Sequence, residues 1–443
     1  METLYQKSRT ISRVKKYFTP YMELLTKPSG HKLFKLFLAV LTMQTVTSIQ
    51  HIYKWFLTGI SKVSQNSYYY LLNSTVLKMD KFAAVTLRKA ISLIEEKCKG
   101  LPVLLLLDDT LQEKFGTKFE CYSTMFDHAY HNGSSYLKGH CFVALTICVP
   151  VAVGNAVHYL NVPVRFRLRK EESKLKIASE MIGDAMKVLK DIPTVILLCD
   201  SWYPKGEVLE TVSTYANLEL IANVRVDTAI YDLPVRTGKR GRPSKKGRKL
   251  NIYTDFTYTL ADKYFTAVRT VLTNLFEQIL YVTVTTPNIG NHGAYRLFVS
   301  TISPEKLNTL FAGYENLLSD SETRQPYLAP LYLYRFRWNI EVMFYELKNF
   351  WSFGNYMLRS KNGIENLINI ISASYACAKI LPFADSAFAS LLPSGPQVIK
   401  YAIGDLIRKD LFFADFVAKL ENLVISSLLL DSFFSSDHFN LSS

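Results

Sequence analysis

Three acidic side chains that lie far apart in the sequence could together hold a divalent cation. Asp108 and Asp200 follow the short apolar runs 102–107 and 193–199, and Glu341 lies in a segment with helical spacing. The carboxyl ends of neighbouring strands meet at one edge of an α/β sheet, where ligand sites form. Carboxylates are ligands that Mg²⁺ prefers, and two such ions support phosphodiester cleavage. The alternative for either aspartate alone is a helix cap or a turn residue.

Residues 331–350 would place a carboxylate, two cations and three aromatic rings on one side of a helix. At about 100° per residue, the side chains that share an arc of about 100° are Tyr334, Arg337, Trp338, Glu341, Tyr345 and Lys348. Arginine and lysine on such a face could grip backbone phosphates. The alternative is an exposed helix face that carries an Arg337–Glu341 or Glu341–Lys348 ion pair.

The elements that must position these residues follow from the apolar pattern. Continuous apolar runs of this length indicate strands buried on both faces. Strands are predicted at 102–107, 139–149, 156–165, 193–199 and 218–225, and helices at 170–190, 205–216, 331–352, 363–382 and 396–430. Strands that alternate with helices predict an α/β core. The residues at 226–330 are β-rich instead, for example at 281–286 and 295–300, and predict a mainly β insertion.

The positive charge is concentrated at the N-terminus. The chain has 443 residues and a net charge of +14, and residues 1–100 hold 16 Lys and Arg against 5 Asp and Glu. Mixed three- and four-residue apolar spacing at 33–43, 50–63 and 82–96 predicts helices there. Basic residues on a small helical domain suit contact with phosphates, so we expect a DNA-binding region. The alternative is lysines that are merely solvated on helix faces.

A second basic cluster lies at 236–249, where eight cations occur without an acid. Its glycines and proline exclude a helix and predict an extended loop. The sequence Arg240-Gly-Arg242-Pro resembles the AT-hook, in which two arginines enter the narrow minor groove of A·T-rich DNA. We expect Arg240, Arg242, Lys245 and Lys246 to contact DNA, with a solvated charged loop as the alternative.

The helix motif resembles that of a known family. The spacing Tyr334-x2-Arg337-x3-Glu341-x6-Lys348 is similar to the Tyr-Arg-Glu-Lys signature of bacterial insertion-sequence transposases of the DDE group. Asp108-Asp109-Thr110 resembles the first aspartate motif of that group, and Leu-Cys-Asp200-Ser-Trp-Tyr resembles the second. The resemblance spans roughly residues 100–380.

This resemblance implies the fold, the chemistry and the partners. The expected fold class is α/β, with a ribonuclease-H-like core, a mainly β insertion, a helical N-terminal domain and a helical C-terminus. Asp108, Asp200 and Glu341 would bind two Mg²⁺ ions, for which Mn²⁺ can substitute. Tyr334, Arg337, Trp338 and Lys348 would contact the transposon end, and Trp338 could instead pack in the core. The partners would be transposon-end and target DNA and a second copy in a homodimer.

The first metal ligand could be either of two adjacent aspartates. Neighbouring residues of a strand project to opposite faces of the sheet, so Asp109 would face away from Asp108. We prefer Asp108 because strands of the family usually end in Asp-x-Thr, and Asp109 remains the alternative.

These features predict five segments along the chain. They are a helical, basic DNA-binding domain at 1–98, the first part of the catalytic core at 99–225, the β-rich insertion with its basic loop at 226–330, the completion of the core with the signature helix at 331–385, and a helical C-terminal region at 386–443.

Other classes of protein are not expected from this sequence. The six cysteines form no C-x-x-C pair, which indicates reduced thiols in a cytosolic protein. We find no signal peptide, no apolar run long enough to span a membrane and no P-loop for a nucleotide. These exclusions predict a cytoplasmic protein, and the resemblance implies a bacterial, nucleoid-associated transposase. The alternatives are a transposase-derived DNA-binding protein without activity and a metal-dependent DNA nuclease.

Overall fold

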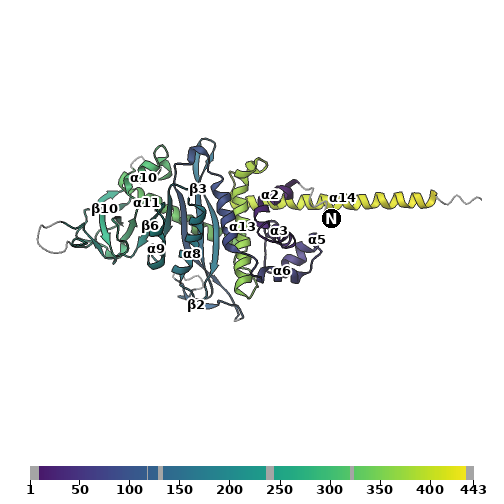
Figure 1. The fold of residues 1–443 in the computed structure, drawn as a ribbon, viewed down its shortest axis with the longest axis horizontal. Coiled ribbons are helices and arrows are strands. Elements are labelled where there is room, and N and C mark those ends of the chain that lie inside the picture. The colour runs from purple at the N-terminus through teal and green to yellow at the C-terminus, as the bar shows by residue number, and fades with distance from the viewer. Residues whose placement is uncertain (1–8, 117, 128–132, 236–243, 320–323, 436–443) are drawn as a thin grey trace, which may run out of the picture.

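The protein is a mixed α/β molecule built around one large sheet, with helices on the sheet and at one end of it (Figure 1). The computed structural model describes residues 9–116, 118–127, 133–235, 244–319 and 324–435, and for part of the last helix it describes the backbone alone.

Five strands form the centre of the sheet. They are β1 (Val103–Glu113), β3 (Tyr136–Val153), β4 (Ala156–Leu168), β5 (Val195–Cys199) and β6 (Leu218–Val224). Their order is β4-β3-β1-β5-β6; β3 is antiparallel to β1 and to β4, whereas β5 is parallel to β1 and to β6. The short β2 (Ser123–Phe126) pairs with the beginning of β3. The predicted central strands are thus confirmed.

The prediction that β1 ends at Asp108 is wrong. Its parallel pairing with β5 stops at Leu107, opposite Cys199, but its antiparallel pairing with β3 continues to Glu113, opposite Gly139. The long partner strand β3 supplies hydrogen bonds beyond the end of β5, so the backbone of β1 stays extended. Asp108 therefore lies inside a strand, at the point where its parallel neighbour ends.

The residues between β6 and the signature helix extend the same sheet. Their strands are β7 (Ile230–Tyr231), β8 (Lys249–Leu250), β9 (Thr259–Ala261), β10 (Tyr264–Thr273), β11 (Leu280–Thr286) and β12 (Arg296–Ser300). Strand β12 is antiparallel to β6, and the order continues β12-β11-β10-β7-β8, with β9 also on β10. Single turns of 3-10 helix lie at η3 (His292–Ala294) and η4 (Glu315–Leu317), around α10 (Pro304–Leu310).

Helices connect and cover the central strands. Helix α8 (Lys174–Val188) joins β4 to β5, and α9 (Gly206–Thr214) joins β5 to β6 and packs on α8. The predicted single helix at 331–352 is divided by a 3-10 turn. The turn η5 (Pro326–Leu328) precedes it, and its parts are α11 (Ala329–Tyr334), η6 (Arg335–Arg337) and α12 (Trp338–Phe350).

The N-terminal helices share one hydrophobic core with the sheet. They are α2 (Arg9–Met22), α3 (Lys27–Thr42), α4 (Ile49–Ile52), the π-helical turn η1 (Tyr53–Leu57), α5 (Thr58–Ile60), α6 (Gln65–Asn73), α7 (Met79–Ile91) and the 3-10 turn η2 (Glu96–Cys98). Phe18 of α2 stacks on Phe37 of α3 at 4.0 Å between ring centroids. Helix α7 also contacts β3, β4 and α8.

Helix α13 (Lys361–Ala384) lies between β4 and the N-terminal helices. The side chain of Asn369 pairs with both backbone groups of Phe166, accepting from its nitrogen at 2.9 Å and donating to its oxygen at 2.8 Å. Helix α13 thereby covers the outer edge of β4. We expected no segment that could span a membrane, but α13 is long and apolar enough to do so. However, 83% of its most apolar 18-residue stretch is buried inside the protein. That burial is typical of a core helix.

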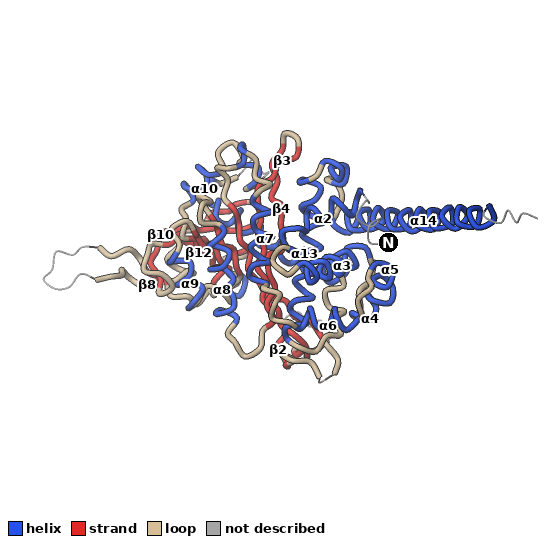
Figure 2. The backbone as a smooth tube through the Cα atoms, turned by 45° about the vertical axis from the view of Figure 1, so that its right-hand side comes forward, coloured by secondary structure: helices blue, strands red, loops and turns tan. Residues whose placement is uncertain are grey.

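The C-terminal residues form the turn η7 (Ser386–Leu391) and the helix α14 (Pro396–Ser435). Helix α14 begins against α2, α3 and α13 and then extends well beyond the rest of the molecule (Figure 2).

All six cysteines are free, and each is buried except Cys121, which is half-buried.

Candidate active site

Two of the predicted acidic residues come from neighbouring strands. Asp200 follows β5 directly, and Asp108 lies on β1 just beyond its last pair with β5. Each is held locally, since an oxygen of Asp108 accepts the Asp109 amide at 2.8 Å and an oxygen of Asp200 accepts the Trp202 amide at 3.1 Å. The parallel pairing of β1 and β5 therefore brings together carboxylates that are 92 positions apart in the sequence.

Helix α12 brings the third acidic residue to the same place through Arg337. One guanidinium nitrogen of Arg337 is 2.9 Å from Asp108 Oδ2, and the other is 2.6 Å from Glu341 Oε1. Only 14% of the Arg337 side chain is exposed. The ion pair with Glu341 that we considered as an alternative therefore exists, but the same guanidinium also bridges to β1.

The electrostatics of the two aspartates favour an added cation. Burial, and after it the charge of Asp200, raises the pKa of Asp108 to about 7. Burial also raises the pKa of Asp200 above its ordinary value. Because desolvation and a like charge both disfavour the ionised form, a cation that binds there would relieve both effects.

Asp109 faces a different set of partners. Its oxygens lie 2.9 and 3.1 Å from Nζ of Lys174, and the hydroxyl of Tyr203 donates to it at 2.8 Å. Asp108 is directed to α12, whereas Asp109 is directed to the beginning of α8, as the alternation of side chains along a strand requires. Asp109 thus already has a cation and a hydroxyl donor.

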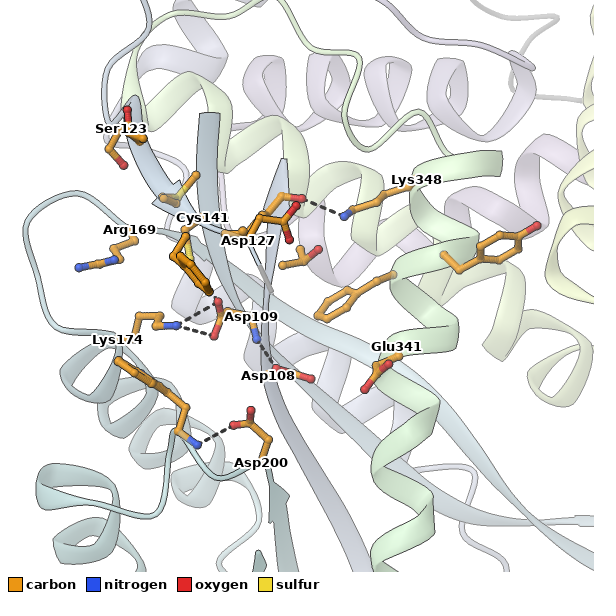
Figure 3. Close-up of a pocket in the computed structure, with 18 of the residues that line it drawn as sticks. Asp108, Asp109, Ser123, Asp127, Cys141, Arg169, Lys174, Asp200, Glu341 and Lys348 are labelled. Carbon is orange, nitrogen blue, oxygen red and sulfur yellow. Dashed lines mark hydrogen bonds and ion pairs between the residues drawn. The ribbon is translucent and has the colours of Figure 1, made fainter. Parts of the chain in front are cut away.

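All these carboxylates line one pocket of about 1090 Å³ (Figure 3). Its wall also contains residues that we did not predict, namely Ser123, Asp127, Cys141, Arg169, Lys170, Lys174 and Trp202. Trp202 is 50% exposed, and Nζ of Lys174 and of Lys205 each lie 4.5 Å from the centroid of its ring. Trp202 was part of the second aspartate motif and could have been noticed, whereas nothing in the local sequence singles out Lys174.

The chemistry of the pocket suits a hard divalent cation, because its acidic walls offer carboxylate oxygens. Among the described residues, however, no group of three or more His, Cys, Asp and Glu side chains is gathered closely enough to hold a metal ion. Arg337 occupies one oxygen of Asp108 and one of Glu341. A cation that uses these two oxygens must therefore displace the guanidinium.

The remaining residues of the signature helix have diverse surroundings. Lys348 lines the pocket and donates to the carbonyl oxygen of Leu111 on β1 at 2.9 Å. Trp338 is 61% exposed, so it does not pack in the core. Tyr334 is half-buried, with its ring 5.0 Å from that of Phe298, and it does not line the pocket.

The described part of the basic cluster, residues 244–249, does not line this pocket. Arg240 and Arg242 fall outside the described residues. Lys245 and Lys246 lie next to β7 and β8 at the far edge of the sheet, and neither lines the pocket. Nζ of Lys246 is 5.0 Å from the ring centroid of Tyr231 and also contacts Asn274.

A comparison with families of known proteins matches residues 21–272 to the family described as DDE superfamily endonuclease. The matched region is more than half of the chain. It contains the two aspartate strands and most of the N-terminal helices, and it ends before α12. No curated protein matches this chain.

Proposed function

Because the chain belongs to the DDE superfamily endonucleases, we propose that it is a DNA transposase that cuts and joins phosphodiester bonds at the ends of an insertion sequence. Membership of the family implies a ribonuclease-H-like core, DNA as the substrate and a general use of divalent metal ions. The strand order β4-β3-β1-β5-β6 is in accord with such a core. The finer assignment to transposition is our proposal.

The observation that carries this proposal is the single pocket shared by Asp108, Asp200 and Glu341. The three residues come from β1, from the end of β5 and from α12, and Glu341 lies beyond the region matched by the family. The pocket is large enough for a phosphodiester and its neighbouring nucleotides. Lysines on its wall, Lys170 and Lys174 among them, provide the positive charge that a DNA backbone requires.

We assign Asp108, Asp200 and Glu341 as the residues that would hold two Mg²⁺ or Mn²⁺ ions. Bound ions of this kind activate the attacking oxygen and stabilise the leaving oxygen of an in-line displacement. The task of the protein is to supply fixed carboxylates from rigid strands and a helix, and to keep the scissile phosphate next to them. Water would attack in the cleavage step, and a 3′-hydroxyl would attack in the joining step.

Several cations and rings would position the DNA. The ammonium of Lys348 uses one N–H to donate to the carbonyl oxygen of Leu111, so it has further N–H donors, and Lys348 lines the pocket. We assign Lys348 and Arg337 to backbone phosphates of the transposon end, with Tyr334 as a further phosphate contact and Trp338 as a platform for an unpaired base. The basic loop, including Lys245 and Lys246, would contact DNA outside the pocket.

The proposal is tested with a supercoiled donor plasmid that carries the gene together with the DNA that flanks it on both sides. With Mg²⁺, the wild-type chain should release or join the ends. Asp200→Asn or Glu341→Gln should lower the rate of this cleavage and joining at least about 100-fold. Glu210→Gln, an exposed carboxylate outside the pocket, is the matched control and should retain activity. Nicks without excised or joined ends would favour a nuclease, and binding without any cleavage would favour an inactive DNA-binding protein.

The DNA contact of α12 is tested by Lys348→Ala. Loss of one phosphate contact should weaken end binding and lower the slope of log affinity against log salt by about one. The affinity for Mn²⁺ should stay unchanged, because the ammonium is not a metal ligand. An unchanged salt slope would contradict the phosphate contact.

A further inference from the structure

A fourth carboxylate, Asp127, lies in the pocket that holds Asp108, Asp200 and Glu341. It follows β2 directly, and only 2% of it is exposed. Its amide donates to the carbonyl oxygen of Ser135 at 2.9 Å, which continues the pairing of β2 with β3 by one residue. Neither the metal site nor the DNA contacts proposed above give this buried carboxylate a role.

The carboxylate of Asp127 faces the lysine of the signature helix. Figure 3 shows it directed at the ammonium of Lys348. Burial lowers the pKa of Lys348, and the charge of Asp127 opposes this shift. A buried carboxylate is costly unless a cation lies close to it, and Lys348 supplies that cation. In the free protein, a carboxylate therefore already faces the ammonium that we assign to a phosphate of the transposon end.

A DNA phosphate and Asp127 cannot both face Lys348 without a cost. Two anions beside one ammonium repel each other, and water screens this repulsion little because Asp127 is buried. Like charges that meet in an interface oppose its formation. A phosphate that binds Lys348 must therefore displace the carboxylate.

The strand that precedes Asp127 is held weakly enough to move. Strand β2 has four residues, lies at one end of the sheet and pairs with β3. Of its four side chains, Met125 alone is buried, in a small cluster with Leu137 and Cys141 that is separate from the large core. Elements with few buried apolar contacts open locally at low cost. All of β2 lines the pocket, so its movement would widen the entrance for DNA.

We propose that Asp127 is an internal substitute for a DNA phosphate. In the free protein it neutralises Lys348, and DNA that enters the pocket takes its place, so that β2 moves aside. This inference rests on the proposed function, because it requires a backbone phosphate at Lys348. The contact would keep the ammonium from loosely held DNA, since only DNA that is seated in the pocket can displace a buried carboxylate.

The test is a double-mutant cycle on DNA affinity, measured by fluorescence anisotropy in EDTA so that no strand is cut. The probes are labelled duplexes taken from the DNA that flanks the gene on each side. Asp127→Asn removes the charge, keeps the shape and should tighten binding about fivefold, because DNA no longer has to displace a carboxylate. In a Lys348→Ala chain, the same substitution should change the affinity less than about twofold, since the contested ammonium is absent.

The matched control is Glu113→Gln, which removes one charge from β1 outside the pocket and should change the affinity less than about twofold. A gain by Asp127→Asn that persists without Lys348 would indicate a general effect of net charge. Weaker binding by Asp127→Asn would indicate that Asp127 only positions Lys348. Either result would overturn the proposal, and a sharp thermal transition shows that each variant is folded.

Hydrogen exchange of the wild type gives a second measurement that needs no variant. With the duplex bound, the backbone amides of β2 should exchange faster, because the strand leaves its place on β3. Unchanged or slower exchange in β2 would show that the strand stays in place, and it would overturn the proposed displacement.

These outcomes are separate from those that test the proposed function. A chain that shows the binding effects but never cuts or joins DNA would support this inference and contradict transposition. A chain that joins ends, but binds them equally well with and without Asp127→Asn, would do the reverse.

Discussion

At the scale of single residues, the two adjacent aspartates of β1 have opposite surroundings. Asp109 is occupied by Lys174 and Tyr203, whereas Asp108 shares the guanidinium of Arg337 with Glu341. Asp109 therefore has the partners of a carboxylate with a structural role. Asp108 has a cationic partner, Arg337, that a metal ion could replace. This difference supports the choice of Asp108 as the first metal ligand, which stays a prediction.

Replacing Asp108 or Asp109 by asparagine distinguishes the metal-binding role from the structural role. Asp109→Asn should lower the free energy of unfolding by about 1–3 kcal/mol, because Lys174 and Tyr203 lose a charged partner, and it should still bind Mn²⁺. Asp108→Asn should bind Mn²⁺ at least about tenfold more weakly. Chemical denaturation and calorimetric titration with Mn²⁺ measure both effects. The reverse pattern would make Asp109 the ligand.

Arg337 should compete with the metal for the oxygens of Asp108 and Glu341. Replacement by leucine removes the competing cation, so we expect Arg337→Leu to bind Mn²⁺ several-fold more tightly. Without metal, the variant should have a lower melting temperature, because two crowded carboxylates lose their counter-charge. Added Mn²⁺ should therefore raise its melting temperature more than that of the wild type.

Thermal unfolding in EDTA and in Mn²⁺ provides the measurement for Arg337→Leu. Arg335→Leu is the control, since within the described part of the chain the hydrogen bonds of Arg335 go to the backbone of Leu318 and Tyr332 and not to a carboxylate of the pocket. Weaker Mn²⁺ binding by Arg337→Leu would show that the arginine positions the carboxylates instead of competing for them.

At the scale of elements, two lysines connect β1 with α12 and the residues that follow it. Lys348 of α12 donates to Leu111 of β1, and Lys114, just beyond β1, donates to Gly354 at 2.5 Å and Tyr356 at 2.7 Å. The ammonium of Lys114 also lies 3.7 Å from the ring centroid of Tyr356. These bonds hold the strand of Asp108 and the helix of Glu341 in one arrangement.

The burial of Lys114 should make stability depend on pH. Burial lowers its pKa from 10.5 to about 8. Above pH 8 the folded chain loses this proton while the unfolded chain keeps it, so the free energy of unfolding rises from about pH 8 to 10.5. Between pH 7.5 and 9.5 we expect Lys114 to contribute an increase of about 2 kcal/mol.

Urea denaturation of the wild type and Lys114→Met at these two pH values isolates this contribution. Lys400, whose pKa burial also lowers to about 8, is present in both proteins and cancels in the comparison. An identical pH dependence in the two proteins would contradict the prediction. The variant should also be less stable at both pH values, because the oxygens of Gly354 and Tyr356 lose their donor.

At the scale of the whole molecule, the N-terminal helices and the sheet belong to one hydrophobic core. Helix α13 contacts α3, α6 and α7 on one side and β4 on the other. The family match also begins at residue 21, within this helical region. The basic helices are thus a structural part of the molecule as well as the expected site of DNA contact.

Deletion of residues 1–95 should prevent cooperative folding, because it would expose α13 and the outer face of β4 to water. We expect the truncated chain to lack near-UV circular dichroism and a sharp thermal transition. The control is the full-length chain with the exposed Lys54, Lys62 and Lys81 changed to glutamine. This control should remain folded and bind DNA with a smaller salt slope. Cooperative unfolding of the truncated chain would show an independent core.

The sequence alone determined the elements that local periodicity encodes. The runs before Asp108 and Asp200 predicted two buried strands, and the spacing from Tyr334 to Lys348 predicted a helix, of which α12 is the longer part beyond the 3-10 turn η6. Such elements can be predicted because apolar side chains are usually buried. Buried positions recur every 2 residues along a strand and every 3.6 residues along a helix. The two aspartate motifs and the signature, in that order along the chain, also sufficed to predict the DDE superfamily; the finer assignment to insertion-sequence transposases stays a prediction.

Only the tertiary structure decided which side chains meet. The bridge from Arg337 to Asp108, the bond from Lys348 to Leu111 and the partners of Asp109 each join residues that are far apart in the sequence. The extension of the sheet by β12 and the continuation of β1 beyond Asp108 depend in the same way on distant partner strands. Local spacing carries no information about such a partner, because the packing of the whole chain selects it.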